Sequence, residues 1–129
     1  MRIVIPVSAG DLIDRITILQ IKKARIPDAA MLVNVTRELD ALVSIREGIP
    51  ELVTRPIRHK ERQLYEQNMV LWNAENRVRI YNAKKDYGKE FVASARRIFR
   101  VNGKRARIKR EINELSGSEL REEKWFAAS

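Results

Sequence analysis

Apolar residues recur at helical spacing through four segments of the chain. In the first segment they stand at positions i, i+4 and i+7, which line one face of a helix. The members of this first stripe are Leu12, Ile16 and Leu19. Ser8 is placed to cap the start of the helix, and Pro27 cannot continue it. The pattern therefore predicts a helix that follows Ser8 and runs to about Ile26.

A second amphipathic segment follows directly. Its apolar stripe consists of Leu32, Val35, Leu39, Leu42 and Ile45. Asp28 can cap this segment, and Gly48 and Pro50 follow its last turn in the order that commonly ends helices. A second helix is therefore predicted over 29–47.

Two long segments make up the rest of the helical pattern. From Ile57 to about Tyr87 the chain has neither proline nor glycine, which predicts one helix of about 30 residues. A second long helix is predicted over 89–116. Its apolar stripe stays in phase across Asn102-Gly103, so we expect it to be continuous although that pair is a favoured turn dipeptide.

These elements predict an all-α helical bundle with a long antiparallel helix hairpin, in a single domain over 1–129. Its parts are two short helices within 1–54, the hairpin over 57–116 and a tail over 117–129. The hairpin is long for a chain of 129 residues. Its far end either projects into solvent or packs against a second subunit, so we expect a homodimer.

The two ends of the chain are predicted to lie outside the helices. Residues 2–7 are β-branched and contain Pro6, which predicts an extended arm or a short edge strand. The tail is expected to add a last helical turn within 119–129. Trp125 and Phe126 are expected to dock this tail by packing.

Composition excludes several kinds of site. Among 129 residues there is no cysteine and one histidine, which excludes disulfides, thiolate metal sites and sites with several histidines. There is also no glycine-rich phosphate loop, so neither a metal nor a cofactor is predicted. His59 lies among Arg58, Lys60 and Arg62 without a nearby carboxylate, and we expect it to be exposed.

The hydropathy pattern predicts no membrane span. No apolar run approaches the roughly 20 residues that a membrane-spanning helix needs. The first residues do not read as a secretory signal, because Asp11 and Asp14 follow a short apolar stretch. The lack of cysteine fits a reducing compartment. We therefore expect a soluble, cytoplasmic protein.

Charge is concentrated in the middle of the chain. The net charge is +9 overall, but residues 1–54 hold 7 basic and 7 acidic residues. Residues 55–110 hold 17 basic and 5 acidic residues, and residues 111–129 hold 2 basic and 5 acidic residues. The middle of the chain is therefore strongly cationic. It should attract an anion such as a phosphorylated metabolite, an acidic protein partner or nucleic acid.

Polar residues form a stripe on each long helix. The stripe on the first consists of Asn68, Trp72, Glu75 and Arg79, and that on the second of Asn102, Arg105, Lys109 and Asn113. Folding the hairpin about Tyr87-Gly88 brings the two stripes together. Arg105 also lies within the apolar seam, where a charge needs a partner. Glu75 and the asparagine side chains are the candidates.

Three interpretations of these stripes stay open. The first is a buried polar network that fixes the register of the helices. The second is a cationic cleft in which Arg79, Arg105 and Lys109 hold an anion, while Glu75 and Asn102 orient them and Trp72 forms an apolar wall. The third is that the stripes face solvent.

A second cationic feature is the run 96–110, which contains no acidic residue. Four of its residues share one helix face turned away from the apolar stripe, and they are Arg97, Arg100, Lys104 and Arg107. One interpretation is binding to nucleic-acid phosphates. The other is pairing with acidic residues elsewhere, for which Glu119, Glu122 and Glu123 are the candidates.

An enzyme is a third hypothesis beside anion binding and nucleic-acid binding. A helical-bundle enzyme that acts on an anionic metabolite would use interior arginine and lysine side chains, with Glu75 as its acid–base group. Asp11 and Asp14 are also spaced as paired carboxylates, but the positive end of a helix explains them equally well. Whether the chain is catalytic therefore stays undecided.

The chain resembles a small bacterial family described only as a domain of unknown function. The resemblance begins in residues 6–22, PVSAGDLIDRITILQIK, and covers nearly the whole chain. Its further motif positions are Asn68, Leu71-Trp72, Glu75-Asn76, Arg79, Phe99-Arg100, Asn102, Arg105-Ala106, Lys109-Arg110, Ile112-Asn113 and Glu122-Glu123-Lys124.

The resemblance implies an accessory service to surface-polysaccharide or nucleotide-sugar metabolism, because members of the family look like companions of glycosyltransferase genes. The chain departs from the family pattern at Asp11 and Gln20, where glutamate is usual, and at Asn76 and Gly103, where an acidic residue is usual. These departures argue against an acid–base role at those four positions.

Overall fold

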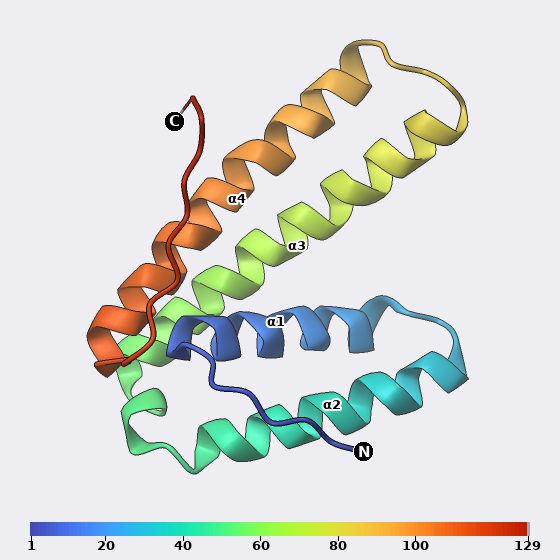
Figure 1. The fold of residues 1–129 in the computed structure, drawn as a ribbon. Coiled ribbons are helices and arrows are strands. Elements are labelled where there is room, and N and C mark those ends of the chain that lie inside the picture. Colours follow the sequence, from blue (N-terminus) through green and yellow to red (C-terminus); the bar gives the residue numbers. More distant parts are fainter. Residues whose placement is uncertain (129) are drawn as a thin grey trace.

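The computed structural model describes residues 1–128, and within them the chain is entirely helical apart from its ends and connections. The elements are α1 (Ala9–Arg25), α2 (Ala29–Glu47), the short 3-10 helix η1 (Pro50–Leu52), α3 (Arg55–Ala83) and α4 (Lys89–Ser116) (Figure 1). The described residues form no strand. The predicted all-α bundle with a long helix hairpin is confirmed.

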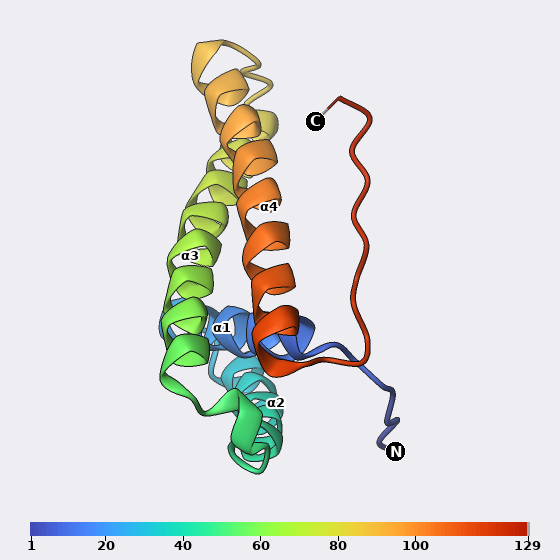
Figure 2. The same ribbon diagram turned by 90° about the vertical axis from the view of Figure 1, so that its left-hand side faces the viewer.

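The hairpin of α3 and α4 is the largest part of the fold. The two helices run antiparallel and make the most extensive contact between any two elements. Helix α1 packs across the open end of the hairpin, and α2 lies on the outer side of α1 (Figure 1, Figure 2). In the described residues no other helix covers the far half of the hairpin, so the expected homodimer contact there stays a prediction.

Helix boundaries follow the local signals in the sequence. The predicted ranges 29–47 and 89–116 are confirmed, and α4 continues through Asn102-Gly103. The Ser8 side chain accepts a hydrogen bond from the backbone N–H of Asp11 at 3.1 Å and so caps α1. Helix α3 ends earlier than predicted, because Lys85 adopts a left-handed conformation with φ of 55°.

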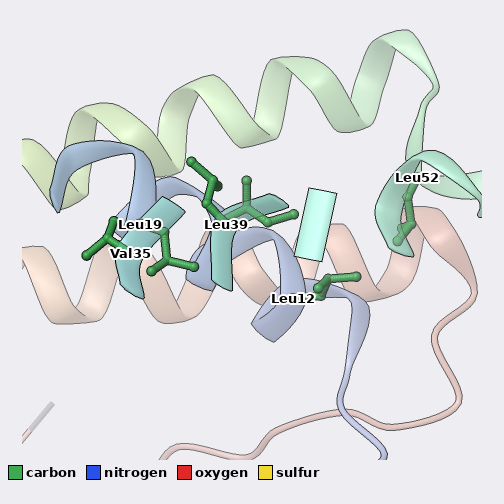
Figure 3. Packing of buried hydrophobic residues seen from close by; sticks show 6 residues of the cluster. Leu12, Leu19, Val35, Leu39 and Leu52 are labelled. Atoms are coloured by element: carbon green, nitrogen blue, oxygen red, sulfur yellow. The ribbon is translucent and has the colours of Figure 1, made fainter. Parts of the chain in front are cut away.

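Helix α1 carries apolar side chains on two of its faces, which explains why it lies between α2 and the hairpin. One face packs on α2 in a cluster of Leu12, Ile16, Leu19, Val35, Leu39 and Leu52 (Figure 3). The other face packs on the hairpin in a cluster of Ile13, Ile57, Leu64, Ile108 and Ile112. Burying each such side chain stabilises the fold by about 1.5–3 kcal/mol.

The two ends of the chain differ from part of the prediction. Residues 1–7 are extended and pair with no strand, so the arm is confirmed rather than the edge strand. The last helical turn predicted within 119–129 is absent from residues 119–128, and Ser129 lies outside the described residues. Docking by Trp125 is also wrong, since this side chain is 84% exposed. The tail is held instead by polar contacts near Ser118 and Glu122.

A membrane-spanning helix needs about 20 consecutive, largely apolar residues. Among the described residues, no helix is both long enough and apolar enough to cross a membrane.

Candidate functional site

A buried carboxylate lies where α1, α3 and α4 meet. Asp14 of α1 is 3% exposed. One of its carboxylate oxygens accepts a hydrogen bond from Asn68 Nδ2 of α3 at 2.8 Å, and the other accepts one from Arg105 Nη2 of α4 at 2.7 Å. Because the Asp14 carboxylate is shielded from water, these bonds are stronger than surface contacts of the same length. Asp14 therefore links the three helices.

Neighbouring polar groups complete this arrangement. The hydroxyl of Thr17 accepts a second hydrogen bond from Asn68 Nδ2 at 2.9 Å and donates to the backbone carbonyl of Asp14 at 2.7 Å. Arg105 Nη1 donates to Asn102 Oδ1 at 3.0 Å. We call the group of Asp14, Thr17, Asn68, Asn102, Arg105 and Lys109 the Asp14 network.

Of the partners predicted for Arg105, an asparagine is confirmed at Asn102, whereas the carboxylate was not predicted. The expectation that this residue needs a partner is met, but its carboxylate is Asp14 and not Glu75. The hairpin seam opens toward α1, so the nearest acid comes from that helix. The signal was present in the sequence, because Asp14 and Thr17 lie on the same α1 face as the buried Gly10 and Ile21.

Lys109 joins the network to the tail. Its Nζ lies 2.7 Å from Glu122 Oε2, 3.6 Å from Asp11 Oδ1 and 4.0 Å from Asp14 Oδ2. The other oxygen of Glu122 lies 2.7 Å from Lys124 Nζ. A single carboxylate of the tail therefore holds two lysine side chains.

These lysines change the titration of Glu122. The hydrogen bond from Lys109, followed by that from Lys124, lowers the pKa of Glu122 from 4.5 to about 2. Because the pKa is lowered in the folded protein, this contact stabilises the docked tail fully above pH 4.5 and is lost as the pH falls toward 2.

The end of α4 caps the start of α1. Asn113 Oδ1 accepts a hydrogen bond from the backbone N–H of Gly10 at 2.7 Å, and Ser118 Oγ accepts one from that of Ala9 at 3.1 Å. Asn113 is 2% exposed. It was predicted as a ligand-binding residue, and in this structure its side-chain oxygen is occupied in holding two helices together.

Arg105 forms part of the wall of two pockets. The first, here called the α1–α3 pocket, has a volume of about 290 Å³ and is lined by Ile18, Ile21, Lys22, Asn68, Leu71, Trp72, Glu75 and Arg105. The second, here called the tail pocket, has a volume of about 250 Å³ and is lined by Asn102, Arg105, Ala106, Lys109, Lys124 and Phe126.

The predicted ligand-binding residues are thus divided between these pockets. Asn68, Trp72 and Glu75 meet Arg105 in the α1–α3 pocket, while Asn102 and Lys109 meet it in the tail pocket. Arg79 reaches neither of them. It lines a third pocket of about 360 Å³ toward the far half of the hairpin.

The outer face of α4 carries unpaired positive charge. Its four predicted side chains, here called the cationic face, are Arg97, Arg100, Lys104 and Arg107. All four are exposed, and none forms an ion pair with any residue in 1–128. The expected pairing of the run 96–110 with a tail acid is found between Lys109 and Glu122, but in residues 1–128 it does not involve the cationic face.

Two further expectations concern histidine and metals. His59 is exposed, as predicted, and its ring nitrogen lies 3.3 Å from Gln63. In the part of the chain that the structure describes, no three histidine, aspartate or glutamate side chains are grouped so that they could hold a metal ion.

The fold and the site define a class of protein: an all-α bundle whose helices meet at a buried carboxylate network flanked by two small pockets. The chain belongs to DUF6165, a family of unknown function, whose family model matches residues 1–129. No curated protein and no solved structure matches the chain closely enough to add a relative.

Proposed function

We propose that the protein binds an anionic ligand in the tail pocket, where Arg105, Lys109 and Lys124 converge on about 250 Å³. The observation that carries this proposal is the position of Glu122, whose carboxylate contacts Lys109 and Lys124 at 2.7 Å each. The two lysines at the wall of this pocket are therefore able to hold a carboxylate, and the oxygens of a phosphate offer the same chemistry with more acceptors.

Displacing Glu122 would not disturb the helices. Lys109 keeps Asp11 and Asp14 within 4.0 Å, and Arg105 keeps its bond to Asp14. A ligand anion would therefore meet two lysine ammonium groups without leaving a buried charge uncompensated. An accessory role in cytoplasmic polysaccharide or nucleotide-sugar metabolism fits this proposal, because nucleotide sugars carry phosphates.

Two substitutions are expected to change phosphate affinity in opposite directions. Lys124→Gln removes one ligand cation and should weaken binding about threefold to tenfold. Glu122→Gln removes the internal competitor and should tighten binding by a similar factor, because Lys109 and Lys124 are then no longer held by a carboxylate of the tail. Isothermal titration with inorganic phosphate and pyrophosphate at low salt measures both effects.

Lys104→Gln is the matched control, because it removes an exposed charge from α4 outside the pocket. It should leave phosphate affinity near that of the wild type. The four proteins compared are the wild type and the three variants. The proposal would be contradicted if phosphate bound to none of them, or if it bound to all four with equal affinity.

The cationic face supports a second candidate function, which is binding to nucleic acid. Its four side chains have no acidic partner in residues 1–128 and stand on one side of a long helix. Few aromatic residues lie between these basic side chains, which disfavours stacking of the nucleobases of a single strand. The expected ligand is therefore the phosphate backbone of a duplex.

If four phosphates are neutralised, log K should fall with log salt with a slope of about −3.6 for duplex DNA. The double variant Arg100→Gln/Lys104→Gln should reduce this slope by about 1.8. Fluorescence anisotropy with a labelled duplex of mixed sequence measures the slope. The control Lys23→Gln/Arg37→Gln removes two exposed charges from α1 and α2, and an equal loss in this control would rule out a specific face.

A further inference from the structure

Two residues in the wall of the α1–α3 pocket each have one buried polar atom without a hydrogen-bond partner. Among the described residues, Asn68 Oδ1, Arg105 Nε and Arg46 Nε are the buried side-chain atoms in this condition. The first two belong to residues that line this pocket. Most buried polar atoms in proteins have a partner, so an acceptor and a donor unpaired beside one cavity require an explanation.

The Asp14 network fixes both atoms in place. Asn68 Nδ2 already donates to Asp14 and Thr17, and turning the amide over would bring its oxygen against the Asp14 carboxylate. The two Nη groups of Arg105 are likewise held by Asp14 and Asn102. The network therefore leaves one acceptor, Asn68 Oδ1, and one donor, Arg105 Nε, unpaired in residues that form the wall of this pocket.

The remaining lining combines apolar walls with two charged groups. Ile18, Leu71 and the indole of Trp72 supply apolar surface. Glu75 and Lys22 are partly buried, and the side chain of neither forms an ion pair or a hydrogen bond with residues 1–128. The volume of about 290 Å³ is far larger than the ~30 Å³ share of one water molecule.

We infer that the α1–α3 pocket is a second binding site, which takes a planar nitrogen heterocycle with a hydrogen-bond donor beside an acceptor, the chemistry of a nucleobase. The ligand donor would meet Asn68 Oδ1 or the Glu75 carboxylate, and its acceptor would meet Arg105 Nε. The ring would pack on the Trp72 indole and the aliphatic wall. This inference does not depend on the anion site.

Nucleosides test the inference, because they carry the heterocycle and no phosphate. The fluorescence of Trp72 is followed in a Trp125→Phe background, since Trp125 is exposed and would add an unrelated signal. Adenosine, guanosine and cytidine are titrated up to about 5 mM. We expect a saturable change with at least one of them.

Glu75→Ala should weaken that binding about fivefold to tenfold, because it removes one ligand acceptor. Glu66→Ala on the same helix is the matched control, since Glu66 is exposed and lies outside the pocket. Circular dichroism verifies that both variants keep their helices. Lys124→Gln should not change nucleoside affinity.

Three other outcomes would overturn the inference. No saturable change with any of the three nucleosides would mean that water fills the pocket. A saturable change that Glu75→Ala leaves intact would place the ring elsewhere on the protein. Loss of binding in Lys124→Gln would assign it to the tail pocket. Failure of phosphate binding together with intact nucleoside binding would contradict only the proposed anion site.

Discussion

Asp14→Asn is expected to lower the free energy of unfolding by about 3–5 kcal/mol, because it breaks a buried ion pair at one partner. Asp14 accepts hydrogen bonds from Asn68 and Arg105 on its two oxygens. An asparagine has one acceptor oxygen, so its NH₂ group would face a donor on one side. The Arg105 guanidinium would also lose its nearest negative charge.

Urea denaturation measures this loss, and the melting temperature should fall by roughly 10–18 °C for a chain of this length. Asp11→Asn is the control, because Asp11 is more exposed and lies 3.6 Å from Lys109; it should cost less than about 1 kcal/mol. The double variant Asp14→Asn/Arg105→Gln should cost less than the sum of its single changes. A loss below about 1 kcal/mol for Asp14→Asn would show that the network does not hold the helices together.

The helices and the hairpin could be predicted from the sequence because their signals are local. Gly48 with Pro50 marks one helix end, and the unbroken segment after Ile57 marks a long helix. The end of α3 was predicted a few residues too far along the chain. A lysine does not favour the left-handed conformation that Lys85 adopts, so the sequence does not indicate it. That conformation follows from how the hairpin connection closes.

The site was predicted only in part, for a reason that lies in the tertiary structure. Helical spacing shows which residues share a face, and it correctly indicated that Arg105 needs a partner inside the bundle. It does not show which helix covers that face. The cover is α1, so the partner is Asp14, and Glu75 is left without an ion pair among the described residues.

The same packing separates the groups that stabilise the fold from those that remain open to a ligand. Arg105 belongs to both groups, because it neutralises Asp14 and also lines both pockets. Replacing it would change stability and binding together. Lys124 and Glu75 are the informative positions for binding, since Lys124 lines the tail pocket, Glu75 lines the α1–α3 pocket, and neither is part of the Asp14 network.

The crossing of α1 and α4 gives the second large expected effect. A Cβ atom at Gly10 would lie 2.5 Å from the backbone carbonyl oxygen of Lys109, closer than any relaxed contact allows. The Gly10 N–H also donates to Asn113 at 2.7 Å. Gly10→Ala should therefore force the two helices apart and lower the free energy of unfolding by about 2–4 kcal/mol.

Gly103→Ala is the matched control, and it should act in the opposite direction. Gly103 lies in the interior of α4, and a Cβ there would meet nothing within 4 Å. Alanine is the better helix former, so this change should raise stability by about 0.5–1 kcal/mol. Urea denaturation of the two variants compares them directly. If Gly10→Ala and the wild type were equally stable, α1 and α4 would lie farther apart at their crossing than described. The distance between Asp14 and Arg105 would then also be longer.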